Sequence, residues 1–537
     1  YEIRLSLVGS EMCIRDRNEC VKKPLKQEQY TLCERNGQLF FSVNTEMELP
    51  ENAPVRLTSA QLEELDYRQL YRAYSPKGRK SKVDPRVLFK IMVYGYQCGI
   101  YSSRKLEEAC RYRIDFRWLL EDQPVPDHAT LARFRTGRCA QAAEELFYQY
   151  VRRLEEQEET DHETVFIDGT KMESRAGRYT FRWRKTVEKQ LDKVKQRVME
   201  ATGLATLEQL AQHVQESKAG IVFVHGTGRR KSQAQRAWEA ADEWRRRWEG
   251  YERDLSIMGS GRNSYSTTDP DATFMRMKED HMRNGQLKPG YNVQIAVNSE
   301  YITGVDVFHD RTDFGTLIPF MKQIEKKHGA RYREVVADAG YESLNNMLFL
   351  ESNGQLCFVK PANYDAQKTK KFRAQIGRIE NMRYDSQEDA FLCAQGRKLL
   401  CRREQTEFES GQPVTTAWYR CESCQGCPKR SLCCRAKDAD KPKEIKWNRT
   451  FWEKRAAAQH NICTPRGIAL RMCRSIQVEG AFALLKTDFA FRRFLTRGKA
   501  NVRTELFFLC MAFNLKKLWM KRENTRLKTH LSEICVA

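Results

Sequence analysis

The chain has 537 residues, of which 93 are Lys or Arg and 71 are Asp or Glu, so its formal net charge at pH 7 is +22. This positive net charge argues against a role that needs an acidic protein. It predicts a polyanionic partner, nucleic acid above all. No apolar run approaches the ~18 residues of a membrane helix, and we interpret the longest, residues 506–513, as part of a core helix. Eighteen cysteines without a secretory signal favour a reduced, intracellular compartment.

The first residues look foreign to the rest of the chain. There is no initiating Met, and residues 5–17 resemble a translated sequencing adapter. We therefore expect residues 1–17 to be an adapter-derived artefact and the natural start to be missing. The alternative is a native leader without fixed structure.

A helical region follows. Asp84 before Pro85 predicts the start of one helix, and Asp127 after a proline-rich break predicts the start of a short basic helix. The pattern favours an all-helical DNA-binding domain over residues 18–158 with a helix-turn-helix-like module. The alternative is a plain helical bundle with a solvated basic face. We expect three arginines of the basic helix to contact DNA: Arg133, Arg135 and Arg138.

Alternating and buried apolar patterns begin at residue 164. The predicted order is strand, insertion, two strands, helix, strand, helix, strand, with Asp313 starting the first of these helices. This order fits an α/β fold, an RNase H-like mixed sheet with flanking helices. We expect this domain to span 159–521, interrupted by a helical arm at about 183–255 and a cysteine-rich insertion at about 365–447, with helix from about 467 and a tail at 522–537.

Three acids are candidate metal ligands. Asp168 and Asp338 each end an apolar strand beside a glycine, and Glu479 lies in a helical pattern. Carboxylates are the hard oxygen ligands that Mg²⁺ prefers, and paired Mg²⁺ ions suit in-line phosphodiester cleavage. Other acids compete for the same roles, namely Asp310, Asp313, Glu342 and Glu505.

Short segments around these acids resemble the motifs of bacterial insertion-sequence transposases of the DDE class. The matching segments are residues 166–171, 336–341 and 478–486 for the three acidic motifs, 268–272 with 288–292 between the first two, and 83–135 for the N-terminal domain. The resemblance implies that Asp168, Asp338 and Glu479 are catalytic and bind Mg²⁺ or Mn²⁺. It also implies that the cysteine-rich block is an insertion domain before the Glu helix.

Related families carry a tyrosine and an arginine before the glutamate and a lysine seven residues after it. Lys486 matches that lysine. Arg474 lies one residue from the expected arginine position, and Met472 stands where the tyrosine would be.

The resemblance implies a transposase that binds terminal inverted repeats and catalyses Mg²⁺-dependent strand cleavage and strand transfer into target DNA. We expect a homodimer on DNA in the bacterial cytoplasm, associated with the nucleoid and not with a membrane. No phosphate-binding Gly-Lys-Ser/Thr loop is present, so we expect no nucleotide cofactor. The alternatives are an RNase H-like DNA nuclease and a catalytically inactive, transposase-derived DNA-binding protein.

Two further clusters stand out. Four cysteines follow the pattern C-x2-C-x2-C-x5-C: Cys421, Cys424, Cys427 and Cys433. This spacing allows three interpretations, namely a structural zinc site, an iron–sulfur cluster or plain reduced thiols. Basic residues after the Glu helix alternate with phenylalanines that are more often core than base-stacking. We expect these basic residues to contact DNA phosphates: Lys486, Arg492, Arg493, Arg497 and Lys499.

Overall fold

The computed structural model describes residues 45–74, 81–225, 231–277, 285–409, 412–434, 438 and 441–530. The segment 1–17, interpreted above as adapter-derived, lies outside these residues. Residue contacts divide the chain into two units, 1–48 and 49–537. In the first unit the described structure is helix α2 (Thr45–Glu48), and everything below concerns the second. Among the described residues, no helix combines the length and apolarity needed to cross a bilayer.

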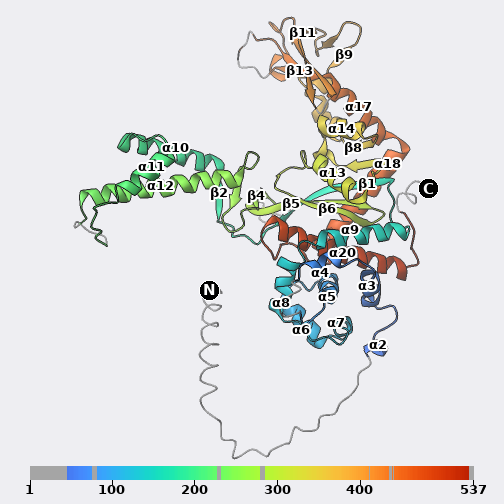
Figure 1. Cartoon of the computed structure of the whole chain (residues 1–537). Helices are drawn as coiled ribbons and strands as arrows, with labels where there is room; N and C mark the ends of the chain where they lie inside the picture. The colour runs from blue at the N-terminus through green and yellow to red at the C-terminus, as the bar shows by residue number, and fades with distance from the viewer. Residues whose placement is uncertain are drawn as a thin grey trace, which may run out of the picture. The chain divides into compact units, whose positions relative to one another are not determined.

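The second unit begins with short helices (Figure 1). They are α3 (Pro54–Glu63), α4 (Arg68–Arg72), α5 (Pro85–Gln97), α6 (Ser103–Tyr112), α7 (Ile114–Leu119), α8 (His128–Arg133), the π-turn η1 (Phe134–Arg138) and α9 (Ala143–Glu156). Both predicted caps are confirmed, since Asp84 accepts a hydrogen bond from the Arg86 amide and Asp127 from the Thr130 amide. Almost every residue of α5 is buried, so this helix forms the centre of the group.

The predicted mixed sheet is confirmed. Its strands are β1 (Thr164–Glu173), β4 (Thr273–Arg276), β5 (Leu287–Asn298), β6 (Tyr301–Phe308), β7 (Glu334–Ala337) and β8 (Leu356–Val359). β1 pairs antiparallel with β5 and parallel with β7, β8 continues parallel beyond β7, and β6 and β4 pair with β5. Ser299 and Glu300 join β5 to β6 with φ angles of 49° and 74°, as a two-residue hairpin turn requires.

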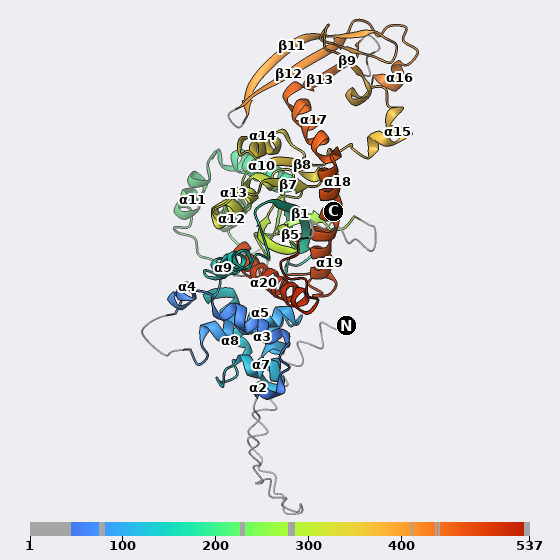
Figure 2. The ribbon, with the colours of Figure 1, turned by 90° about the vertical axis from the view of Figure 1, so that its right-hand side faces the viewer.

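Helices cover both faces of the sheet (Figure 2). Val165 and Ile167 of β1 pack with α13 (Leu317–His328) in one apolar cluster, near α14 (Leu344–Ser352). Phe166, between them, belongs to the opposite cluster, because successive side chains of a strand point to opposite faces. That second cluster includes α20 (Lys499–Glu523) and the N-terminal helices, so the helical region and the sheet share one hydrophobic core.

Two insertions leave this framework. The ribbon of β2 (Phe181–Trp183) and β3 (Ser264–Ser266) carries the helical arm, which consists of α10 (Arg184–Thr202), α11 (Leu207–Glu216) and α12 (Gln233–Met258). The arm has its own apolar cluster, in which Trp248 is buried.

The cysteine-rich insertion forms an antiparallel sheet of five strands. They are β9 (Arg383–Asp385), β10 (Ala390–Leu392), β11 (Lys398–Glu409), β12 (Gln412–Cys421) and β13 (Glu444–Asn448), accompanied by the short helix α16 (Arg430–Cys433). The chain then continues through α17 (Arg449–Cys463), α18 (Pro465–Arg474), the π-turn η5 (Ser475–Glu479) and α19 (Gly480–Lys486) to α20. Helix therefore returns at Arg449, earlier than the predicted residue 467, because Asn448 caps α17.

One buried ion pair joins α20 to the loop between α9 and β1. Lys521 of α20 lies 2.8 Å from Glu159, which follows α9, and each side chain is 2% exposed. The Tyr301 hydroxyl and the Lys528 amide also donate to the Glu159 carboxylate. Such a pair is costly to break, because removing one partner leaves the other charge buried and uncompensated.

Replacing Glu159 by Ala should therefore destabilise the protein by about 3–5 kcal/mol. Its neighbour Glu158 supplies the control, since its ion pair with Lys528 is exposed and should be replaceable with little effect. Urea unfolding followed by tryptophan fluorescence would measure both. Equal losses in the two variants would contradict the assignment.

Candidate active site

The sheet register places two of the predicted acids side by side. Ile167 of β1 pairs with Ala337 of β7, and Asp168 and Asp338 are the next residues on these parallel strands. Asp168 accepts a hydrogen bond from the Gly169 amide, and Asp338 accepts one from the Gly340 amide, each at 2.8 Å. The parallel pairing and these hydrogen bonds fix both carboxylates side by side. Asp338 directly follows β7 as predicted, but the prediction that Asp168 ends its strand is wrong, because β1 continues to Glu173.

Arg474, at the end of α18, brings the third acid to these two carboxylates. Its guanidinium lies 3.2 Å from a carboxylate oxygen of Asp168, 3.9 Å from one of Asp338 and 3.4 Å from one of Glu479. The Asp168 side chain is 10% exposed, whereas those of Asp338 and Glu479 are 41% and 57% exposed. Three acids separated by up to 311 residues of chain thus share one cation.

A π-turn sets the position of this cation. Five residues apart in a regular α-helix, Arg474 and Glu479 would point in different directions, since each residue turns the helix by about 100°. The π-turn η5 closes i to i+5 hydrogen bonds and returns the two side chains to one face. The π-turn therefore compensates for the one-residue offset of Arg474 from the arginine position of the sequence motif. Met472, at the tyrosine position, is instead 63% exposed.

Asp313 lies beside the three acids, and its predicted role as a helix cap is wrong. Helix α13 begins after Thr316, and the Asp313 carboxylate accepts hydrogen bonds from Asn292 at 2.8 Å and Gln294 at 2.7 Å. A Cβ atom at Gly169 would lie 2.5 Å from an Asp313 oxygen, nearer than real Cβ atoms approach. Asp313 is therefore packed against Gly169 of β1, where the absence of a side chain makes room for it.

The other competing acids serve the structure. Glu342 pairs with buried Arg455 at 3.0 Å, and Glu505 accepts hydrogen bonds from Thr496 and from the Tyr96 hydroxyl. Burial raises the pKa of Glu505. Asp310 is exposed and forms no part of the group around Arg474.

Hard carboxylate oxygens are the donors that Mg²⁺ takes, so the chemistry of the three acids fits this ion. Their present arrangement does not yet form a cage: within the described ranges, no group of three His, Cys, Asp or Glu side chains is placed to hold a metal ion. The guanidinium of Arg474 is the cation that the carboxylates face instead.

The cysteines that lie together in the fold are not the same set as those in the sequence pattern. Cys421 is part of the apolar cluster of the small sheet, and Cys393, Cys424 and Cys433 pack against it. The Lys443 amide donates to the Cys424 sulfur at 3.3 Å. Cys401 also packs against this cluster and Cys427 does not, so the thiols that share this core include Cys393 and Cys401 but not Cys427.

The predicted DNA-contacting residues fall into two groups. Arg133 and Arg138 are exposed, but Arg135 is 7% exposed and donates to the Tyr101 carbonyl at 2.7 Å. Its expected contact with DNA is therefore wrong, because its charge is used inside the protein near Glu505.

The basic segment after α19 is tied to the loop after β1. Arg493 donates to the carbonyls of Ser174 and Ala176, and Arg497 donates to that of Arg175. Arg492, Arg493 and Arg497 remain exposed, whereas Lys486 and Lys499 are partly buried. The three phenylalanines among them are core, as the commoner alternative predicted: Phe489, Phe491 and Phe494.

Replacing Arg474 by Gln should leave three carboxylates without their shared cation. We expect the melting temperature in EDTA to fall by a few degrees, about 1–2 kcal/mol, and Mg²⁺ to raise it more than in the native protein. Arg471→Gln, one helical turn earlier, is the control. Thermal unfolding with and without Mg²⁺ measures both effects, and identical metal responses would contradict a shared cation position.

Comparison with known families adds independent evidence. A model described as a transposase DDE domain matches residues 392–519, which include Glu479, and the transposase domain DUF772 matches residues 43–137. Neither segment includes Asp168 or Asp338. No curated protein and no solved structure matches the chain. The two family matches support the resemblance to the insertion-sequence transposases of the DDE class that the sequence motifs show.

Proposed function

We propose that the chain binds the terminal inverted repeats of its element and catalyses Mg²⁺-dependent DNA strand cleavage and strand transfer. The observation that carries this proposal is the convergence of Asp168, Asp338 and Glu479 on Arg474, within 3.9 Å of its guanidinium. The family matches support a transposase, and the acids supply the chemistry that such a reaction needs.

The arrangement of the sheet supports an RNase H-like catalytic domain. β1 has antiparallel neighbours on one side and parallel neighbours on the other, as the predicted mixed sheet requires. Asp338 directly follows β7, Asp168 lies beside it within the parallel strand β1, and the third acid comes from a helical segment against the same edge.

The three acidic side chains differ in how firmly the structure holds them. Asp168 and Asp338 accept hydrogen bonds from the amides of Gly169 and Gly340, whereas Glu479 is the most exposed of the three. When bound, divalent metal would activate the attacking oxygen and stabilise the leaving one. Asp168, Asp338 and Glu479 would hold it, and Arg474 would keep the carboxylates together before it binds.

Exposed cations would position the DNA. Arg133 and Arg138 lie on the basic helical run of the N-terminal region, and Arg492, Arg493 and Arg497 follow the Glu helix. Such contacts to phosphates set the register of a duplex without reading its sequence. Two ends must be processed together, so the proposal includes a homodimer on DNA.

The test is cleavage and joining on labelled duplexes that carry the candidate terminal repeats, with Mg²⁺ or with EDTA. We expect nicking at the repeat boundary and joined product, and Asp338→Asn should lower both by about 10²–10³-fold. Asp310→Asn is the matched control, because this acid is exposed and outside the group.

Other outcomes would support the alternatives. Binding to the repeats without nicking would indicate an inactive DNA-binding protein. Nicking that ignores the repeats and gives no joined product would indicate a general nuclease.

Structural zinc in the cysteine-rich insertion stays a prediction. If it is present, the purified chain should contain one zinc, and Cys424→Ser should lose it. Cys427→Ser should retain it, because Cys427 lies outside the cluster that the other thiols share. Metal analysis of the three proteins would decide, and zinc loss in Cys427→Ser would restore the ligand set that the spacing predicts.

A further inference from the structure

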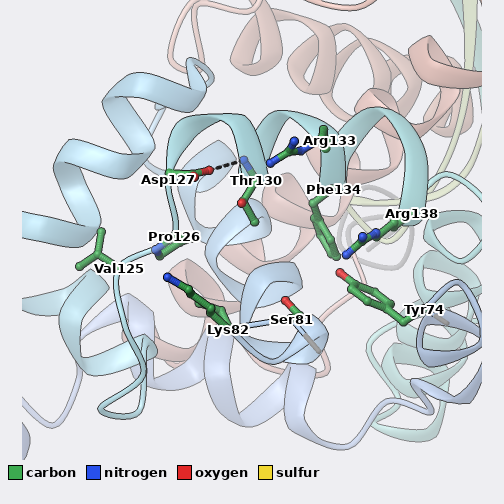
Figure 3. A pocket seen from close by; sticks show the side chains of 11 residues that line it. Tyr74, Ser81, Lys82, Val125, Pro126, Asp127, Thr130, Arg133, Phe134 and Arg138 are labelled. Atoms are coloured by element: carbon green, nitrogen blue, oxygen red, sulfur yellow. Dashed lines mark hydrogen bonds between the residues drawn. The ribbon is translucent and has the colours of Figure 1, made fainter. Parts of the chain in front are cut away.

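A pocket of about 590 Å³ opens in the N-terminal helical region (Figure 3). Its walls come from Tyr74 after α4, from residues 81–83 before α5, and from residues 125–138. Its volume lies within the range of sites for small organic ligands.

The rim of the pocket is positive. Lys82, Arg133 and Arg138 line it and are exposed, and the Arg138 guanidinium lies 4.3 Å from the centre of the Tyr74 ring. The one acid in the lining, Asp127, already accepts a hydrogen bond from the Thr130 amide as the cap of α8. Charge complementarity therefore favours an anionic ligand.

Apolar side chains also line the pocket. Val83 and Phe134 are 2% and 1% exposed, and Pro126 is buried beside them. The hydroxyl-bearing residues Ser81 and Thr130 also line the cavity. Such a lining suits a nucleobase, which has an apolar face and a polar edge.

A π-turn assembles these features. Residues 134–138 form η1, with the Cys139 amide donating to the Phe134 carbonyl at 3.0 Å. Arg133 and Arg138 are five residues apart, and the wider turn returns both to the same opening, as η5 does for Arg474 and Glu479. π-turns of this kind occur frequently at functional sites.

We propose that this pocket binds one unstacked nucleotide of a DNA strand, with its base against Phe134 and its phosphates on Lys82, Arg133 and Arg138. This inference rests on the proposed function, since it assigns a DNA contact to the transposase. Taking a base out of a duplex costs a few kcal/mol, and stacking on protein recovers about 1–3 kcal/mol per base. A nucleotide that is already unpaired should therefore bind best.

The test compares three duplexes of one sequence by fluorescence anisotropy with the full chain in EDTA. The first is fully paired, the second carries one extra unpaired thymidine, and the third carries an abasic residue at that place. We expect the thymidine bulge to bind about tenfold more tightly than the paired duplex, and the abasic bulge to bind like the paired one. Equal affinities, or an equal gain for the abasic bulge, would overturn the proposal.

Matched variants locate the effect. Ser81→Trp, which fills the cavity, and Lys82→Glu should each abolish the preference for the thymidine bulge. Lys105→Glu makes the same charge change at an exposed lysine of α6, outside the pocket lining, and should keep the preference. Thermal unfolding verifies that each variant is folded. A preference that survives in both pocket variants would overturn the proposal.

A nucleotide competitor separates a DNA strand from a free small molecule. Excess thymidine 5′-monophosphate should remove the bulge preference, whereas inorganic phosphate should not. Stabilisation by the nucleotide without any effect on the bulge preference would overturn the proposal in favour of a small-molecule site. If the chain binds the paired duplex but shows no preference for the bulge, only the proposal that the pocket binds a nucleotide is refuted. If the chain binds no duplex at all, the proposed function is refuted as well.

Discussion

Mutual repulsion among three carboxylates is the constraint on which the candidate site depends. At about 4 Å, two unit charges interact by roughly 1 kcal/mol in water and several times more in a partly buried setting. Asp168 and Asp338 are forced together by the pairing of β1 with β7, so a cation must stand between them. Arg474 meets that need and also reaches Glu479, which makes one guanidinium the common partner of three elements.

The sequence predicts the strands that carry Asp168 and Asp338 because each is a short apolar run ending in an acid. It does not predict the π-turn, since one extra residue in a helix shifts the hydrophobic pattern only slightly. Arg474 is therefore displaced by one residue in the sequence motif, although the fold returns it to the carboxylates. Counting residues along the sequence predicts which side chains share a helix face only where the helix is regular.

Two residues were misjudged because their partners lie elsewhere in the chain. Asp313 has the local pattern of a cap, but its carboxylate meets the amides of Asn292 and Gln294 on β5. Arg135 has the local pattern of a solvated basic face, but it lies buried near Glu505, about 370 residues away in sequence. A window of neighbouring residues contains neither partner, so tertiary packing alone decides these roles.

The same long-range contacts fix the geometry between the helical region and the site. Arg135 follows the pocket residue Phe134 and lies near Glu505, and Glu505 accepts hydrogen bonds from the amides of Leu495 and Thr496. The Leu495 carbonyl in turn accepts from the arginine that closely follows β1 at position 175. These groups share one hydrophobic core and no linker separates them within the described residues. The fold itself therefore holds the pocket on η1 at a set distance from the end of β1. If DNA binds at both places as proposed, binding at one would place it relative to the other.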